Sequence, residues 1–340
     1  MTTQNTIESK EGKYPSELRQ DIITGHWVVI ATGRAKRPDE FVSPCEVGVS
    51  GSDPFENPEE SGQEPDVLIY RQENNDWSLR VFPNKFPAFV HGRTPKETGE
   101  GPYYAKTGVG HHEVIVTRDP VHSIAEMEVW RVAELVDAYQ ERYLALMNKK
   151  SVSYIQIFHN HGREAGASLA HPHSQLMAIP VVPSELVVDL EGSKRYFQAH
   201  RQNVFDVILE HELKTKKRVV FENEHFVVFC PYASRSAFEV WVMPKRDNAY
   251  FERITDEEKF SCGEALKIAL ASLFKGLENP AYNFFIHTAP CDGQEYKHFR
   301  WHIEIIPRTT VWAGFELSTG IEVSTIEPEV AAPFLRSQIA

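Results

Sequence analysis

Apolar residues recur along the chain at spacings that predict alternating strands and one long helix. In the first half, short apolar runs predict strands over 113–117 and 154–158. Between them, apolar positions three and four residues apart predict a helix from about 125 to 148. A loop containing Gly and Ala over 160–168 then leads to a further predicted strand, His171–Ile179.

The second half of the chain repeats this order of elements. Its predicted elements are a strand over 239–243, a helix from about 256 to 275, a strand over 282–286 and a strand over 301–307. Thr255 and Glu258 form a capping box at the start of the helix. We therefore expect an α+β fold of two related units, each with an antiparallel sheet and one long helix.

The repeat divides the chain into two predicted domains, residues 1–190 and 191–340. The join is expected near Pro183–Arg201. A stretch rich in Gly, Ser, Pro and Glu over 48–65 predicts a loop or an insertion. The alternative is a chance likeness between two generic strand–helix–strand–strand units.

The most informative polar motif is the sequence His-Pro-His-Ser-Gln at 171–175. Side chains alternate between the faces of a strand, so His171, His173 and Gln175 are expected on one face. An imidazole that binds no metal can attack phosphorus, and an amide can donate a hydrogen bond to a phosphoryl oxygen. The alternative is a pair of partly buried strand histidines. In the repeat, His171-x-His173 corresponds to His302-x-Glu304.

Composition excludes several classes of protein. Apolar residues make up 41% of the chain and charged residues 25%, as in ordinary soluble domains. The formal charge of −12 argues against binding to nucleic acid or to an anionic membrane. The first residues are polar, and no apolar run reaches membrane-spanning length, so we expect a cytoplasmic protein. None of the four cysteines forms a CxxC pair, which predicts free thiols.

Taken in order, the motifs resemble those of the galactose-1-phosphate uridylyltransferase family, a branch of the histidine-triad superfamily. Each motif is short, but the ordered series is specific and covers nearly the whole chain. The matching segments are Asp21–Ile30, Arg34–Pro38, Arg80–Pro87, Pro120–His122, Asn160–Ser168, residues 171–175, His287–Pro290, Trp301–Arg308 and Gly314–Glu316. The resemblance implies two tandem histidine-triad-like units.

The resemblance also implies a double displacement at one histidine. His173 would attack the α-phosphorus of a nucleotide sugar, expel a sugar 1-phosphate and carry the nucleotide, and a second sugar 1-phosphate would then take it. Gln175 would hydrogen-bond the phosphoryl group or the covalent adduct. The leading prediction is therefore a transferase that moves UMP between hexose 1-phosphates with ping-pong kinetics.

Further residues are assigned to the substrate by the resemblance. Phosphate, nucleoside and sugar contacts would come from Arg34, Arg37, Phe82, Asn84, Asn160, Ser168, Glu316 and Glu322. For the two arginines the alternative is surface charge, and for Phe82 it is core packing. Thr310 stands where the galactose enzymes have a lysine, and Glu322 where they have a glutamine. The acceptor sugar therefore stays open. The choice between uracil and adenine stays open as well, because Lys85 stands where some members have an acidic residue near the ribose.

Many family members bind zinc through a CxxC and two histidines. In this chain the CxxC positions carry Asp53 and Glu56, and the histidine positions carry His122 and His171. Carboxylates and imidazoles can hold zinc or iron, and the alternative is an empty site closed by carboxylate–histidine hydrogen bonds. A second family CxxC appears here as Asn203-x-x-Asp206, also without sulfur.

A different metal site in some relatives has counterparts in the second half. His287, His302 and Glu304, with Asp189 or Glu191 as the acid, could hold a structural zinc or iron, and the alternative is a metal-free polar network. We expect no organic cofactor. A homodimer is expected from the resemblance, because the C-terminal segments of close relatives reach the neighbouring site.

Other functions stay open from the sequence. In a nucleotide-sugar phosphorylase of the ADP-glucose type, or a dinucleoside-polyphosphate phosphorylase, inorganic phosphate would take AMP from the same histidine. A non-catalytic nucleotide-binding relative is the alternative from another class. A metal-dependent hydrolase is disfavoured because no dense carboxylate motif accompanies residues 171–175.

Overall fold

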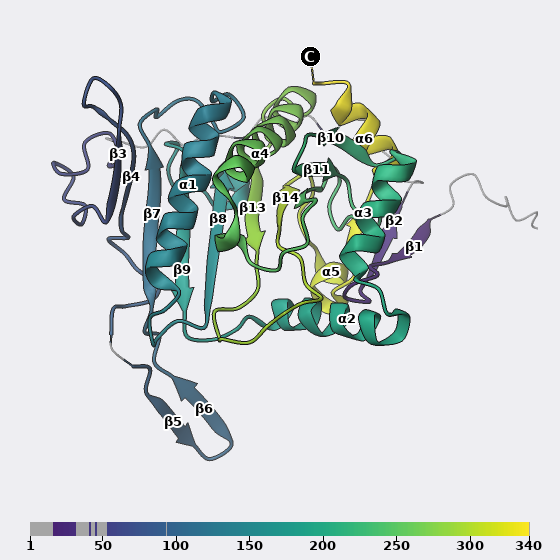
Figure 1. Cartoon of the computed structure of the whole chain (residues 1–340), viewed down its shortest axis with the longest axis horizontal. Coiled ribbons are helices and arrows are strands. Elements are labelled where there is room, and N and C mark those ends of the chain that lie inside the picture. Colours follow the sequence, from purple (N-terminus) through teal and green to yellow (C-terminus); the bar gives the residue numbers. More distant parts are fainter. Residues whose placement is uncertain (1–15, 32–40, 42–44, 46–52, 93, 340) are drawn as a thin grey trace, which may run out of the picture.

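The strands predicted in both halves join one antiparallel sheet of ten strands (Figure 1). The computed structural model describes residues 16–31, 41, 45, 53–92 and 94–339. In spatial order the strands are β10 (Val219–Glu222), β11 (Phe226–Phe229), β12 (Val240–Pro244), β14 (His302–Pro307), β13 (Tyr282–His287), β8 (Tyr154–His161), β9 (His173–Ile179), β7 (His111–Thr117), β4 (Trp77–Pro83) and β3 (Leu68–Arg71). The predicted α+β class is confirmed.

The order of the strands is symmetric about the centre of the sheet. The outermost-to-central order is β3, β4, β7, β9, β8 on one side and β10, β11, β12, β14, β13 on the other. Helix α1 (Val129–Leu146) follows β7, and helix α4 (Asp256–Gly276) follows β12. The capping box of Thr255 and Glu258 is present at the start of α4. The internal repeat is therefore real, and its two halves have the same topology.

The two predicted sheets are fused into one. Strand β8 pairs with β13, where Phe158 lies opposite Phe285. Each strand satisfies the hydrogen-bonding edge of the other, which an isolated unit would expose. The predicted division at 190/191 falls inside α2 (Ser184–His200). The sheet is continuous across the two halves. The division into two domains therefore stays a prediction.

The register of the sheet corrects the alignment of the two motifs. Gln175 lies opposite Phe158 on β8, and Glu304 has the equivalent place on β14. His173 therefore corresponds to His302. The sequence had suggested that His171 corresponds to His302, which is an error of two residues. A shift of two residues keeps every side chain on the same face of a strand, so alternation alone could not reveal the error.

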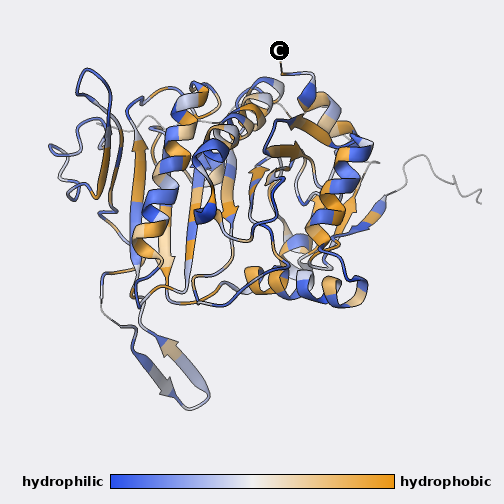
Figure 2. Cartoon of the chain, in the orientation of Figure 1, coloured by the Kyte–Doolittle hydropathy of each residue, from blue (hydrophilic) through white to orange (hydrophobic). Residues whose placement is uncertain are grey.

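Helices α1 and α4 lie side by side over one face of the sheet (Figure 1). Their apolar stripes face the strands, and their polar stripes face outward (Figure 2). Buried residues of this layer come from both helices and both halves of the sheet: Leu79, Val81, Ile115, Val132, Leu135, Ile155, Leu176, Val228, Val240, Leu266, Leu270, Phe284 and Ile303. One core therefore unites the two halves, and each fully buried Leu or Ile in it contributes about 1.5–3 kcal/mol.

The opposite face of the sheet is covered unevenly. Helices α2 and α3 (Val204–Thr215) pack against the second half, where Leu186 and Phe205 join a cluster with Trp241 and Met243. The equivalent face of the first half carries a smaller cluster around Phe55. Among the described residues, the strand face that bears the 171–175 motif is thus covered by fewer apolar side chains than its counterpart in the second half.

Some elements were not predicted from the pattern because they are too short to show a period. They include β1 (Glu17–Gln20), β2 (Trp27–Ile30), β5 (Glu97–Glu100), β6 (Tyr103–Lys106), α5 (Gly314–Thr319), β15 (Val323–Ser324) and α6 (Pro328–Arg336). The β5–β6 hairpin projects from the body of the protein (Figure 1). All four cysteines are free, as predicted. Among the described helices, none is long and apolar enough to cross a membrane.

Candidate functional site

His173 and Gln175 lie on the face of β9 that points away from α1 and α4. Leu176, which alternates with them, is buried under the helices, so the pleat places the other two on the opposite face. His171 was expected on the same strand but lies before it, since β9 begins at His173. Pro172 lacks the backbone N–H that would extend the ladder by a hydrogen bond.

The imidazole of His173 is held in one orientation. Its Nδ1–H donates to the carbonyl oxygen of His171, which lies 2.8 Å away. The lone pair of the ring is therefore on Nε2. Phe55 contacts the ring edge-on at 5.2 Å between centroids, and His173 is 8% exposed. A fixed imidazole with an unprotonated Nε2 can act as a nucleophile.

Gln175 is oriented by a buried histidine that no sequence motif had singled out. Nδ1 of His112 accepts from the backbone N–H of Ala88 at 3.2 Å, so its proton lies on Nε2. That nitrogen is 2.8 Å from Oε1 of Gln175 and donates to it. Burial lowers the pKa of His112, which keeps the ring neutral. With its oxygen engaged, the groups of Gln175 that remain for a ligand are its amide N–H donors.

The predicted nucleoside contacts take two different places. Nδ2 of Asn84 lies 3.2 Å from Nε2 of His112. Asn84 and Gln175 therefore both lie beside the same nitrogen of His112. Phe82 is fully buried, and its ring centroid lies 5.7 Å from that of Phe55. Packing beneath the site, the alternative for Phe82, therefore accounts for this residue.

The predicted phosphate contacts are only partly described. Asn160 lies at the end of β8 on the same face as Gln175. Ser168 is exposed in the loop that follows β8. Arg34 and Arg37 lie outside the residues that the structure describes.

Asn160 belongs to a small amide network that sequence reasoning missed. Nδ2 of Asn283, on β13, donates to Oδ1 of Asn160 at 2.7 Å. Nε of Arg308 donates to Oδ1 of Asn283 at 2.6 Å. This arrangement fixes the amide of Asn160 and brings a guanidinium, with its paired donors for phosphate oxygens, to the same face. The signal in the sequence was only the position of Arg308 at the end of the Trp301–Arg308 segment.

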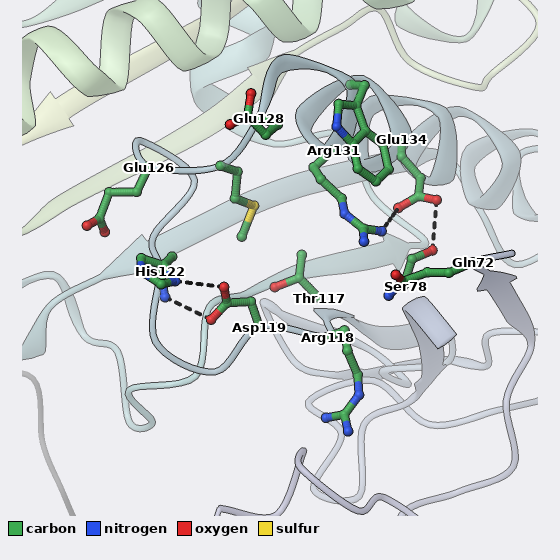
Figure 3. A pocket seen from close by; sticks show the side chains of 12 residues that line it. Gln72, Ser78, Thr117, Arg118, Asp119, His122, Glu126, Glu128, Arg131 and Glu134 are labelled. Atoms are coloured by element: carbon green, nitrogen blue, oxygen red, sulfur yellow. Dashed lines mark hydrogen bonds and ion pairs between the residues drawn. The ribbon is translucent and has the colours of Figure 1, made fainter. Parts of the chain in front are cut away.

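The four residues of the first predicted metal site do not come together. Asp53 and His171 form a hydrogen bond of 2.6 Å between Oδ2 and Nδ1. His122 is exposed and pairs instead with Asp119, at the rim of a cavity of about 480 Å³ (Figure 3). Glu56 is exposed, and in the part of the chain that the structure describes it forms no hydrogen bond or ion pair with either histidine. These residues do not fit a metal ion, so the metal ligand prediction is corrected here.

A second histidine cluster lies in the other half of the sheet, at the place equivalent to that of His173 and Gln175. Side-chain donor atoms of His287, His302 and Glu304 lie within 4.8 Å of one another. Oδ2 of Asp189, on α2, is 3.8 Å from Nδ1 of His287, whereas Glu191 is exposed. The predicted second set is therefore assembled, with Asp189 as its acid.

An unpredicted arginine neutralises this second cluster. Arg235 forms an ion pair with the buried carboxylate of Glu304. The positive charge of Arg235 keeps the pKa of Glu304 below its usual range despite burial, whereas burial next to Glu304 raises the pKa of Glu239. Burial also lowers the pKa of His302 to about 3 and raises that of Asp189 to about 6. The neutral His302 and the ionised Glu304 are chemically suited to zinc or iron.

The two carboxylates predicted to contact the sugar lie near the C-terminus and interact with groups close to them in the second half. Oε2 of Glu316 accepts from the backbone N–H of Ala313 and caps α5. Glu322 is buried, and burial raises its pKa, with Arg235 opposing the rise. Their contact with a sugar stays a prediction.

Comparison with known proteins places the whole chain among nucleotide-sugar enzymes. A family model described as "Galactose-1-phosphate uridyl transferase, N-terminal domain" matches residues 5–183, and a model for a domain of unknown function matches residues 109–337. An ADP-glucose phosphorylase from Arabidopsis thaliana is 34% identical, over 97% of this chain and 94% of its own length. A galactose-1-phosphate uridylyltransferase from Thermotoga maritima is 29% identical, over 94% and 98%.

Solved structures give the same pattern. An ADP-glucose phosphorylase from Arabidopsis thaliana with bound ADP-glucose superposes with a TM-score of 0.80 at 30% identity, covering 95% of this chain and 99% of that one. A uridylyltransferase superposes with a TM-score of 0.73 at 27% identity, covering 95% and 98%. The likeness therefore spans both halves of the sheet and includes the 171–175 motif.

Proposed function

The chain belongs to the galactose-1-phosphate uridylyltransferase family, and we propose that it transfers a nucleoside monophosphate through a covalent adduct on His173. The observation that carries the proposal is the fixed imidazole: Nδ1 is bound to the His171 carbonyl at 2.8 Å, and Nε2 has the lone pair. Gln175 lies two residues away on the same face with its oxygen held by His112.

The chemistry proceeds in two displacements at one phosphorus. Nε2 of His173 attacks the α-phosphorus of the nucleotide sugar, the bond from that phosphorus to the bridging oxygen breaks, and a sugar 1-phosphate leaves. An oxygen of the acceptor phosphate then attacks the same phosphorus and breaks the P–N bond, which returns Nε2 to its neutral form. Gln175 donates to the phosphoryl oxygens in both steps. One site therefore serves both half-reactions.

We infer that the donor is ADP-glucose and that inorganic phosphate is the acceptor, giving ADP and glucose 1-phosphate. The Arabidopsis thaliana ADP-glucose phosphorylase supports this choice, with 34% identity over nearly the full length of both chains. The acceptor side supports it as well, since Thr310 replaces the lysine of the galactose enzymes. Arg308, two residues earlier, offers a cation next to Asn160 through Asn283.

Uridylyl transfer between hexose 1-phosphates is the second candidate. The match of the uridyl transferase family model over residues 5–183 and the 29% identity to the Thermotoga maritima enzyme favour it. In that reaction UMP moves from UDP-glucose to galactose 1-phosphate, and His173 and Gln175 have the same roles.

Product analysis separates the two candidates. The enzyme is incubated with ADP-glucose or UDP-glucose, each with inorganic phosphate or galactose 1-phosphate, and the nucleotides are resolved by chromatography. We expect ADP and glucose 1-phosphate to form fastest, from ADP-glucose and phosphate. Faster formation of UDP-galactose would establish the second candidate instead, and no product from any pair would contradict both.

The rate of adduct formation should depend little on pH above 6.5. Burial lowers the pKa of His173 from its ordinary value of 6.5, because a buried imidazolium loses hydration. Nε2 is therefore unprotonated in most molecules at pH 6.5 and above, and the midpoint of the acid limb lies below 6.5. Rapid-quench measurement of the adduct across pH tests this, and an acid limb centred above 6.5 would contradict it.

We also propose that the second cluster holds a structural zinc or iron ion through His287, His302, Glu304 and Asp189. When bound, such an ion would fix α2 against β13 and β14 and would supply no Lewis acid to His173. The assembly of three donors within 4.8 Å supports the proposal, and metal analysis of the purified protein measures it.

A homodimer is proposed for the active form. Around Glu316 the chain exposes several large apolar side chains, and Val311 is 93% exposed. These residues are Val311, Trp312, Phe315 and Leu317. A second copy would cover them and could bring Glu316 to the site of its neighbour, which light scattering and the effect of Glu316→Ala can test.

A further inference from the structure

His171 is fixed by three groups although its predicted metal site does not assemble. Nε2 of its ring donates to the carbonyl oxygen of Thr117 at 2.6 Å. Nδ1 lies 2.6 Å from Oδ2 of Asp53. The Phe55 ring packs edge-on against it at 5.8 Å between centroids. His171 is only 2% exposed, so both nitrogens that could bind a metal are already engaged within the protein.

Asp53 uses both of its carboxylate oxygens. Oδ2 binds the ring of His171, and Oδ1 accepts from the backbone N–H of Phe55 at 2.9 Å. These two hydrogen bonds tie the 53–55 segment to His171. The Phe55 ring then packs against both His171 and His173. The carboxylate therefore closes the site through hydrogen bonds, where thiolates would close it through a metal.

The backbone of His171 carries this restraint to the catalytic ring. Its carbonyl oxygen accepts from Nδ1 of His173 at 2.8 Å. If the side chain of His171 moves, that carbonyl moves with it, and the proton of His173 is no longer directed to Nδ1. Fixing the tautomer of a catalytic imidazole through its second nitrogen is a recognised way of keeping the first available.

The second half of the chain repeats this arrangement with an arginine in place of His171. Arg300 lies two residues before His302, and its carbonyl oxygen accepts from Nδ1 of His302 at 3.0 Å. Its guanidinium donates to the carbonyl oxygen of Pro244 at 3.3 Å and forms an ion pair with Asp206. Pro244 ends β12 as Thr117 ends β7, and Asp206 stands at the second position of the former CxxC.

This repetition shows how the fold closes both positions without sulfur. Arg300 is 1% exposed, and a guanidinium has no lone pair with which to bind a metal. Its place is nevertheless built from the same parts as that of His171: a carboxylate, a strand-end carbonyl and the i−2 carbonyl that holds a histidine. In this fold, a buried basic side chain paired with a carboxylate can therefore hold the backbone carbonyl that accepts from the histidine two residues later.

We propose that Asp53 is a positioning residue, which clamps His171 without a metal ion and thereby holds His173 in the tautomer that exposes Nε2. The proposal rests on the proposed function of His173 for its kinetic consequences. It assigns no chemistry to Asp53 itself, whose carboxylate bonds to His171 and to the backbone of Phe55.

The kinetic test uses substitutions for which a metal-free clamp and a metal site predict different rates of adduct formation. We expect Asp53→Ala to slow formation of the His173 adduct by about 10- to 100-fold. Asp53→Asn should stay within a few-fold of the unchanged enzyme, because an amide keeps one bond to the ring and one to Phe55. Glu56→Gln and His122→Ala are the matched controls and should leave the rate unchanged. A metal site would make all four variants slow.

Metal content gives a second readout from the same proteins. Zinc and iron per chain should be equal in the unchanged enzyme and in Asp53→Ala, since the clamp holds no ion. Loss of one metal equivalent in Asp53→Ala, together with slow adduct formation in Glu56→Gln and His122→Ala, would overturn the proposal.

Nitrogen NMR of the imidazoles keeps the clamp testable if no nucleotide sugar labels His173. The unchanged enzyme and Glu56→Gln should show His173 as a single Nδ1–H tautomer, and Asp53→Ala should show a mixture. A single Nδ1–H tautomer in folded Asp53→Ala would overturn the clamp. Absence of labelling in the unchanged enzyme, with the tautomer pattern as expected, would instead contradict the proposed function alone.

Discussion

Replacing His173 with alanine is expected to abolish nucleotide transfer. Loss of a catalytic nucleophile lowers turnover by roughly 10⁶-fold in enzymes whose residues act as a unit. The fold should survive, because among the described residues the His173 ring makes one hydrogen bond, to the His171 carbonyl, and lies outside the main core between the sheet and helices α1 and α4. Turnover with ADP-glucose and phosphate measures the loss, and circular dichroism reports the fold.

A matched histidine substitution serves as the control for this result. His211 is exposed on α3, far along the chain from the 171–175 motif, and His211→Ala should keep full turnover. Retention of even a tenth of the activity in His173→Ala would mean that another group attacks the phosphorus or that no covalent adduct forms.

Replacing Gln175 with alanine is expected to reduce turnover by about 10²- to 10³-fold, equivalent to about 2.7–4 kcal/mol of transition-state stabilisation. His112 holds Oε1 at 2.8 Å, so the amide N–H groups are directed before the substrate arrives. Charge accumulates on the phosphoryl oxygens in the transition state, and donors already in place stabilise it without reorganisation. Single-turnover kinetics measures the effect on each half-reaction.

The control for Gln175 is Gln198→Ala, on the exposed surface of α2, which should leave turnover unchanged. An increase in KM with unchanged kcat in Gln175→Ala would contradict the account, because it would show that the amide contributes only to ground-state binding.

Much of the fold followed from periodicity. The 3.6-residue pattern over 125–148 corresponds to α1, and the repeat of strand, helix and strands corresponds to the symmetric halves of the sheet. The starts of elements were less accurate, as when β9 began at His173 instead of His171. Fusion of the two sheets through β8 and β13 was not predicted, since the pattern of one strand does not specify which edge its partner will occupy.

The candidate site was predictable only where its residues share a motif. His173 and Gln175 are two positions apart, so alternation along one strand relates them directly. His112 lies 63 residues from Gln175, and Arg235 lies 69 from Glu304, so their contacts depend on the register of neighbouring strands and loops. No local pattern encodes such pairs.

The two halves diverge in what covers equivalent faces. In the first half, Gln175 is half-buried, and Asn160 on the neighbouring strand is bonded through Asn283 to Arg308. In the second half, α2 and α3 cover the face of His302, and Arg235 neutralises Glu304. Burial lowers the pKa of His302 to about 3, yet its Nε2 faces a closed cluster. The repeat thus places its two equivalent histidines in different surroundings.

Mass spectrometry of the peptide that contains residues 171–175 tests the central claim most directly. The protein is incubated with ADP-glucose or UDP-glucose without acceptor, quenched and digested, and the modified residue is located by fragmentation. The account predicts a nucleoside monophosphate on His173, absent from His173→Ala and removed when phosphate or a sugar 1-phosphate is added. No adduct from either donor, or an adduct on any other residue, would contradict it.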